Sequence, residues 1–255
     1  MIANLHTHTP RCNHAIGAEQ DYVQVALKEG LKVLGFSDHT PYFFPGDYYS
    51  RMRMYPEELT GYADTVRALQ KQYAGKLEIP LGVEVEYYPN LFPQLLPVLR
   101  DAGIAYMLLG QHWNEDEMGQ DYNGRPTEDA AKLSRYCDQV VDAMQTGLFT
   151  YVAHPDLLHF VGDKTVYIQQ MSRICKEAKA CAIPLEINLL GINEGRHYPN
   201  PLFWELAGAE GCQVVIGSDA HMPDHVVHKE PEKIAMALID EMGLELIEIP
   251  QLVRI

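Results

Sequence analysis

Short apolar runs recur along the whole chain, and each is followed by polar residues and then by an amphipathic stretch. Apolar runs of three to five residues that are bounded by turn or polar residues are typical of buried strands. The pattern therefore predicts seven strands, at residues 2–5, 33–36, 79–83, 106–109, 151–153, 185–187 and 214–216.

Helices are predicted between these strands. The stretch 18–29 carries Val23, Ala26 and Leu27 on one face, and 56–73 opens with a proline and two glutamates, as expected of a first helical turn. The other expected helices span residues 91–101, 127–145, 164–180, 201–209 and 232–242. Because strands and helices alternate, the sequence predicts an α/β fold with a parallel sheet.

The spacing of the strands favours a closed or nearly closed barrel, since seven strands fit within about 220 residues. An open, doubly wound sheet is the alternative. No G-x-G-x-x-G follows the first strand, which disfavours a dinucleotide-binding version of that alternative.

Polar side chains follow each predicted strand. In a parallel barrel the C-terminal ends of all strands open on one face, so residues at these ends should converge in space. They are His6 and His8, Asp38 and His39, Glu84, His112, His154 and Asp156, Asn188, and Asp219 and His221.

Histidines and carboxylates are ligands suited to zinc, manganese or iron. Six of the eleven histidines lie at or just past strand ends, and His14 follows in the loop after the first strand. In the pairs His6/His8 and Asp219/His221, a spacing of two places both side chains on one side of an extended segment. Nine ligands are too many for one metal ion, so two or three divalent ions are expected.

The segments that carry these residues resemble the motifs of the PHP (polymerase and histidinol phosphatase) superfamily. The motifs are, in chain order, HTHTPRCNHA, SDHTP, GVEVEY, GQHW, AHPD and GSDAH. The resemblance runs from His6 to His221 and is greatest to the stand-alone histidinol-phosphatase branch. It implies one PHP-type domain over residues 1–255, folded as a distorted, TIM-like barrel of seven strands with a di- or trinuclear metal centre at the C-terminal face.

The resemblance also implies which side chains share a metal ion. The first ion would be held by His6, His8, Glu84 and Asp219. Glu84, which matches the first glutamate of the family's G-x-E better than Glu86 does, would bridge to a second ion held also by His112 and His154. The third ion would be held by His14, His39 and His221.

Phosphate-ester hydrolysis is the reaction that this set implies. Bound cations lower the pKa of water from 15.7 to about 7 in strong cases, and a metal-bridging hydroxide would attack phosphorus. Glu84, Asp219, His221 and Arg196 are the expected catalytic residues. L-histidinol phosphate is the best single substrate, and its hydrolysis to L-histidinol and phosphate would serve histidine biosynthesis.

Other functions remain open from the residues alone. One alternative is a phosphodiesterase or nuclease-type PHP enzyme acting on small nucleotides. A non-catalytic metal-binding domain is disfavoured because all nine positions carry a ligating residue type. A metal-dependent amidohydrolase is disfavoured because the sequence shows neither an eighth strand nor a bridging lysine.

Arginines are the natural partners of a phosphate group at this site. Arg196, in the loop after the sixth strand, is the first choice, and Arg11, Arg51 and Arg53 are weaker candidates.

Two further groups of residues have alternative expected roles. Asp38 or Asp156 would orient a metal-bound histidine or protonate the leaving group. The aromatic loop 42–49 would either contact the organic part of the substrate or form a packed lid.

Composition adds limits to these expectations. The formal charge of −15 argues against binding long nucleic acid, but not against a small phosphorylated substrate. Five cysteines without a C-x-x-C pair predict reduced, mostly buried thiols. No long apolar run or signal-like segment is visible, so we expect no membrane partner and a cytoplasmic location.

Overall fold

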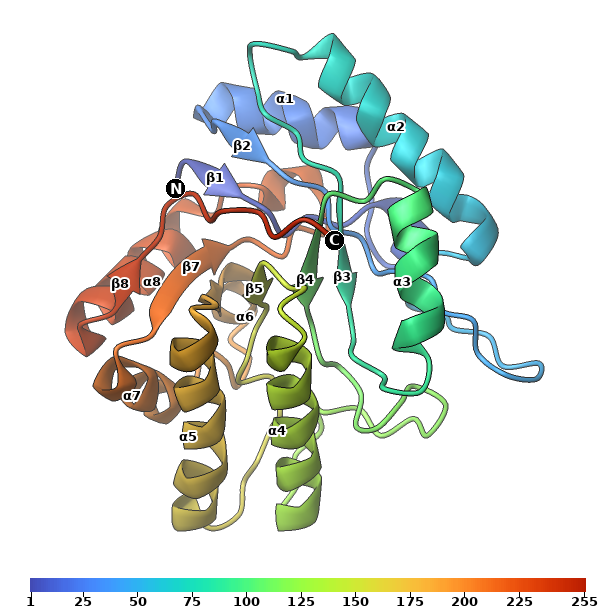
Figure 1. Cartoon of the computed structure of the whole chain (residues 1–255). Helices are drawn as coiled ribbons and strands as arrows, with labels where there is room; N and C mark the ends of the chain where they lie inside the picture. The colour runs from blue at the N-terminus through green and yellow to red at the C-terminus, as the bar shows by residue number, and fades with distance from the viewer.

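Two parallel sheets form the centre of the molecule, and the computed structural model describes all residues, 1–255. Strands β1 and β2 pair as a two-stranded sheet, and six further strands pair in chain order, β3 to β8. Their bounds are Ala3–Asn4 for β1, Val33–Leu34 for β2, Gly82–Val85 for β3, Tyr106–Leu109 for β4, Tyr151–Val152 for β5, Leu185–Asn188 for β6, Gln213–Gly217 for β7 and Glu245–Leu246 for β8. The predicted parallel α/β arrangement is therefore confirmed (Figure 1).

The regular ladders do not close into the expected seven-stranded ring. Only isolated bridges join the two sheets. Thr7 bridges Ala220 on one side, and Val33–Glu78, Phe36–Leu81 and His39–Glu84 form bridges on the other. The strands are short, so few residues are left to pair regularly at these seams. The doubly wound alternative is disfavoured too, because its strand order reverses at a switch point and the order β3 to β8 does not.

An eighth strand was missed by the sequence pattern. Strand β8 has only two residues and pairs with β7 at the sheet edge, where Glu245 is exposed. A strand of this length with one exposed glutamate has no apolar run to reveal it. The strand count consequently no longer separates this chain from the amidohydrolase class.

Eight helices surround the strands, and all seven predicted ones are present within three residues of the expected ends. Their bounds are Glu19–Glu29 for α1, Leu59–Gln72 for α2, Phe92–Asp101 for α3, Ala130–Gln145 for α4, Lys164–Cys181 for α5, Leu189–Asn193 for α6, Pro201–Glu210 for α7 and Lys229–Met242 for α8. The predicted helix at 56–73 begins as a 3₁₀ turn, Pro56–Glu58. The side chains of Asp129, Asp163 and Asn200 cap the first turns of α4, α5 and α7.

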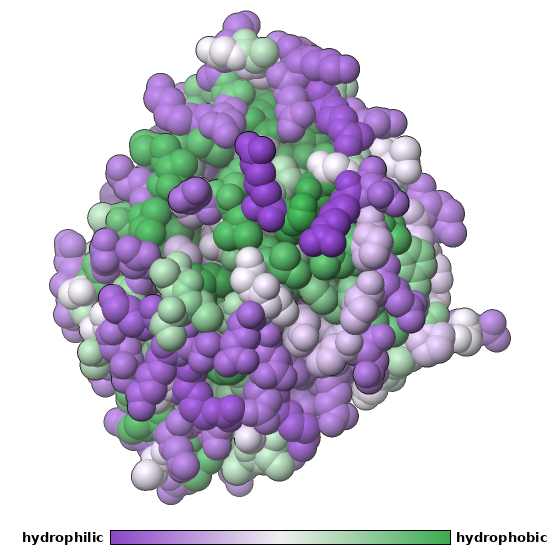
Figure 2. All heavy atoms as spheres, in the orientation of Figure 1, coloured by the Kyte–Doolittle hydropathy of each residue, from purple (hydrophilic) through white to green (hydrophobic).

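Buried side chains form two clusters, because residues along a strand alternate between its two faces. In β4, Met107 and Leu109 belong to a cluster of 55 residues that packs against the helices. Tyr106 and Leu108 belong to a cluster of eight, which also draws on β1, β2, β5 and β7. Helices α4 and α5 lie side by side (Figure 1), and mostly hydrophilic residues cover their outer surface (Figure 2). No helix is long and apolar enough to cross a bilayer.

Candidate metal centre

The two histidines that follow β1 both point into the interior. Thr7 forms a bridge with Ala220, so His6 and His8 on either side of it share the opposite face of the segment. Their exposed fractions are 0% and 1%. The expectation that the spacing of two brings both side chains to one site is met.

Glu84 in β3 lies at the centre of the histidines. Its Oε1 atom is 2.9 Å from His154 Nε2 and 3.7 Å from His112 Nε2. Its Oε2 atom lies 3.2 Å from His39 Nδ1 and 3.5 Å from the Nε2 atoms of both His6 and His8. A carboxylate that reaches five imidazoles with two oxygens has the position expected of a bridging ligand.

Asp219, after β7, lies on the other side of the first two histidines. Its Oδ1 atom is 3.1 Å from His8 Nε2, 3.5 Å from His6 Nε2 and 3.4 Å from His221 Nδ1. Asn188, the residue after the sixth predicted strand, donates from Nδ2 to Asp219 Oδ2 at 3.2 Å. The aspartate is thus held in place by a neighbouring strand.

Ligand atoms gather in groups that could each hold one ion. One group is His6, His8 and Asp219, and another is His14, His39 and His221; within each, the ligand atoms lie within 4.8 Å of one another. His154 groups with Glu84 and His6, whereas His112 lies further from the Glu84 carboxylate. All nine predicted residues therefore meet at one place, with His14 on its solvent-exposed side.

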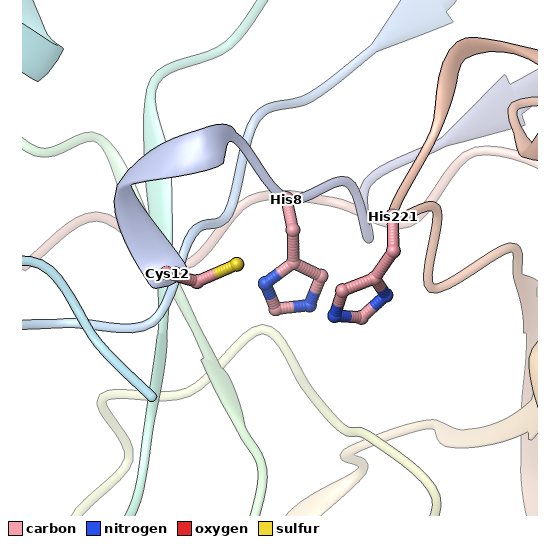
Figure 3. A group of neighbouring side chains, drawn as sticks. All are labelled: His8, Cys12 and His221. Atoms are coloured by element: carbon pink, nitrogen blue, oxygen red, sulfur yellow. The ribbon is translucent and has the colours of Figure 1, made fainter. Parts of the chain in front are cut away.

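Cys12 adds a thiol that the sequence analysis treated only as a buried residue. It lies in the 3₁₀ turn Pro10–Cys12, and its ligand atom is within 4.8 Å of those of His8 and His221. Figure 3 shows its sulfur directed at the His8 ring, with the His221 ring on the far side of His8. The position of Cys12 within the histidine-rich HTHTPRCNHA segment was the sequence signal for a thiol at this site.

The donor set fits divalent ions because several buried polar atoms have no hydrogen-bond partner. Burying such an atom without a partner costs free energy, so an orphaned cluster indicates a missing ligand. The atoms are His6 Nε2, His8 Nε2, His39 Nδ1, His154 Nδ1 and Glu84 Oε2. Nitrogen and carboxylate donors in this number suit zinc, manganese or iron.

The charges in the cluster shift the pKa values of its histidines in opposite directions. Burial by itself lowers the pKa of His6, but Glu186, Asp219 and Glu84 outweigh it and raise that pKa well above 6.5. For His221, burial and the neighbouring His8 lower the pKa to about 3. Without bound metal, the carboxylates therefore favour a proton on His6, whereas burial disfavours one on His221.

Two of the nine residues have a strained backbone. His154 has φ 31° and Asp219 has φ 50°, values that residues with a side chain seldom adopt. The backbone N–H of His154 donates to Glu186 Oε2 at 3.0 Å, which helps to hold this conformation. Such strain concentrates at functional sites.

Two glycines leave room for buried carboxylates. A Cβ atom on Gly110 would lie 1.9 Å from Glu84 Oε1, and one on Gly217 would lie 1.7 Å from Glu186 Oε1. The glycines of the GQHW and GSDAH segments are therefore required by close approach.

Outer carboxylates orient three of the histidines, as metal-binding imidazoles require. Glu186 Oε1 lies 2.8 Å from His6 Nδ1, Glu86 Oε1 lies 3.0 Å from His112 Nδ1, and Asp38 Oδ1 lies 3.4 Å from His8 Nδ1. Sequence reasoning named Asp38 for this role but missed both glutamates. Their signal was a charged residue within a buried strand for Glu186 and directly after one for Glu86.

Asp156, the other residue named for this role, contacts no histidine of the cluster. It accepts a hydrogen bond from the backbone N–H of Asn200 at 2.5 Å and so ties down the loop before α7. Burial raises its pKa to about 7.

A cavity of about 640 Å³ opens onto the cluster. Arg196 lines it, pairing with Glu194 at 2.7 Å and donating to the Tyr198 hydroxyl at 2.5 Å. Its other lining groups include Arg51, Arg125, Trp113 and Tyr122, of which only Arg51 was among the candidates.

Two weaker candidates are wrong as phosphate ligands. Arg11 pairs with Glu19, and Arg53 is buried in ion pairs; neither lines the cavity. Residues 42–49 do not line it either, so this loop matches the packed-lid alternative.

A parallel α/β fold that gathers histidines and carboxylates at the C-terminal ends of its strands defines a class of proteins with a site for several divalent ions. A family model of the PHP domain matches residues 4–189, so the chain belongs to the PHP domain family. Asp219 and His221 lie beyond the matched residues.

Relatives and solved structures agree with this family. The chain is 32% identical over 238 residues to a probable histidinol-phosphatase of Deinococcus radiodurans, with 88% of each chain covered. It is 33% identical over 252 residues to the histidinol-phosphatase of Bacillus subtilis, covering 87% of this chain and 94% of that one. The fold is similar to the crystal structure of histidinol phosphate phosphatase from Lactococcus lactis complexed with zinc, L-histidinol and phosphate, with a TM-score of 0.72, 16% identity and coverage of 96% and 95%.

Proposed function

We propose that the chain is a metal-dependent phosphomonoester hydrolase whose nine clustered side chains hold two or three divalent ions. The observation that carries this proposal is the set of buried, unpartnered ring nitrogens of His6, His8 and His39, which are directed at Glu84 or Asp219. His6, His8, Glu84 and Asp219 would hold one ion.

The remaining ligands complete the centre. Glu84, His112 and His154 would hold a second ion, with Glu84 as the bridge, and His14, His39 and His221 would hold a third. Bound divalent ions supply Lewis-acid activation of water and of the phosphoryl oxygens.

Histidinol phosphate is the substrate that we infer, giving L-histidinol and phosphate. Two relatives above 30% identity, which match most of this chain, are named as histidinol-phosphatases. A cavity of about 640 Å³ has room for an imidazole-bearing phosphomonoester. Its wall combines arginines with the edge-to-face pair Trp113 and Tyr122, which suits a substrate with one anionic and one aromatic end.

Arg196 is the residue that we assign to the phosphate group. Its guanidinium is fixed by Glu194 and by the Tyr198 hydroxyl, and it lines the same cavity as Asp219 and His221. A fixed planar cation binds phosphate oxygens with two parallel N–H donors. Arg51 and Arg125 are further cations on this wall.

The proposal extends to the whole chain as one domain, residues 1–255, with a distorted seven-stranded barrel. The eight-residue cluster supports it, because side chains of β1, β2, β4, β5 and β7 meet there as they would inside a barrel. In this arrangement β8 would lie outside the ring.

The decisive experiment measures phosphate release by the metal-loaded protein from histidinol phosphate, sugar phosphates, nucleotides and a phosphodiester. Histidinol phosphate should have the highest kcat/KM. Hydrolysis of the diester alone would contradict the phosphomonoesterase assignment.

A matched variant tests the metal ligands in the same assay. His154→Ala should abolish activity while the protein stays folded, and a control at a half-buried histidine outside the cluster, His228→Ala, should keep it. Full turnover by His154→Ala would show that the ligand assignment is wrong.

A further inference from the structure

Arg53 is a buried arginine between two buried carboxylates, outside the cavity. Only 2% of it is exposed. Its Nη1 atom lies 2.9 Å from Glu86 Oε2, and its Nη2 atom lies 2.5 Å from Glu117 Oε2. Nη1 also donates to the backbone carbonyl of Thr40 at 3.0 Å. The guanidinium therefore joins three separate segments of the chain.

One of the two carboxylates belongs to the metal centre. Glu86 Oε1 lies 3.0 Å from His112 Nδ1, while the opposite ring nitrogen of His112 faces Glu84. Arg53 holds one oxygen of Glu86, so the other oxygen stays directed at His112 Nδ1 and leaves Nε2 free as a ligand atom.

The other carboxylate anchors the cavity wall. Glu117 lies in the loop between Trp113 and Tyr122, and it accepts hydrogen bonds from the hydroxyls of Tyr48 and Ser50. Trp113 Nε1 also lies 3.1 Å from the Sδ atom of Met52, the residue that precedes Arg53 in the sequence. The loop before α2 and the loop after β4 are thus fastened to each other at two points.

We propose that Arg53 is a positioning residue that sets His112 in the metal centre and the Trp113–Tyr122 wall of the cavity at the same time. A buried cation that loses its place leaves two buried carboxylates without their partner, and such groups move toward other partners. Movement of Glu86 frees His112, and movement of Glu117 loosens the loop that carries Trp113 and Tyr122. The metal ligand and the substrate wall are coupled because one planar guanidinium serves both.

The test compares Arg53→Lys with Arg173→Lys, a surface arginine that pairs with Asp138. Lysine keeps the charge but cannot bridge two carboxylates as a guanidinium does. Each Zn²⁺-loaded protein is dialysed against graded chelator, and bound zinc is counted. We expect Arg53→Lys to lose its first zinc equivalent at a chelator concentration about 10-fold lower than the wild type, whereas Arg173→Lys behaves as wild type.

A second variant separates the two sides of Arg53. Glu117→Gln removes the ion pair on the wall side but keeps an acceptor for Arg53 and leaves its pair with Glu86 in place, so it should raise KM for the phosphomonoester at least about 3-fold while zinc retention stays close to wild type. Folded Arg53→Lys with wild-type zinc retention and KM would overturn the proposal. If Arg53→Lys does not fold, an unchanged KM in Glu117→Gln overturns it.

The KM measurement rests on the proposed function, but zinc retention needs no substrate. A protein that fails to hydrolyse histidinol phosphate and still shows the zinc effect would contradict the substrate and leave the role of Arg53 intact.

Discussion

His6 Nδ1 lies 2.8 Å from Glu186 Oε1, and this contact sets the direction of the opposite ring nitrogen. Nε2 consequently faces Glu84 and Asp219, each at 3.5 Å. Glu186 also accepts from the backbone N–H of His154, a second residue of the cluster. One outer carboxylate therefore orients two of the side chains that we propose as ligands.

Replacement of this carboxylate should weaken metal binding. In Glu186→Gln the amide lacks the charge that holds Nδ1 protonated, so the affinity for zinc should fall about 10- to 100-fold. Competition with a chromophoric chelator measures it, and Glu205→Gln on the exposed side of α7 is the matched control. Wild-type affinity in Glu186→Gln would show that the contact has no orienting role.

A methyl group on Gly110 should displace Glu84. Its Cβ would lie 1.9 Å from Glu84 Oε1, so Gly110→Ala should lower the free energy of unfolding by about 1–3 kcal/mol and remove bound zinc. Gly61→Ala is the control, because nothing lies within 4 Å of that position and alanine favours the helix α2 by up to about 1 kcal/mol. Denaturant unfolding and zinc analysis report both effects. A Gly110→Ala protein with full zinc content would contradict the crowding argument.

The residues at strand ends could be found from the sequence because their convergence follows from the fold. Once strands and helices alternate, His6 and Asp219 must meet at the same face, however far apart they lie in the chain. Outer partners such as Glu186 were not found, because a glutamate within an apolar run carries no sign of which histidine it faces.

The missed elements have a different physical cause. Helix α6 has five residues and follows β6 directly, with Asn188 as both strand end and N-cap, so no separating loop marks it. The two sheets meet at seams such as Thr7 and Ala220, where a single bridge replaces a ladder. Pairing between distant short segments leaves no periodic pattern in either of them.

Binding of zinc to the metal-free protein should release protons. The neighbouring carboxylates raise the pKa values of His6 and His8 well above 6.5 despite burial, so both imidazoles carry a proton near neutral pH in the absence of metal. Zinc requires the unprotonated nitrogen, and binding must displace those protons. Calorimetric titrations at pH 7 in buffers of different ionisation enthalpy should therefore give different apparent enthalpies. Identical enthalpies in all buffers would contradict the protonated state.

Acidification should destabilise the metal-free fold through a histidine pair outside the cluster. The rings of His159 and His197 are stacked at 4.0 Å, and His197 Nε2 lies 2.7 Å from the carbonyl oxygen of Leu157. Burial and the nearby His159 lower the pKa of His197 below 6.5. The unfolded chain therefore binds a proton at His197 at a higher pH than the folded chain does.

The stability that His197 contributes is complete above about pH 6.5 and is lost as the pH falls toward the lowered folded-state pKa. His197→Gln keeps an N–H donor for Leu157 but does not titrate. Between pH 8 and pH 5 the free energy of unfolding should consequently fall less steeply in the metal-free variant than in the metal-free wild type. The histidines of the metal centre contribute equally to both proteins, so the difference between the two slopes isolates His197. Denaturant titrations at each pH give the slopes. Parallel curves for the variant and the wild type would contradict the role assigned to His197.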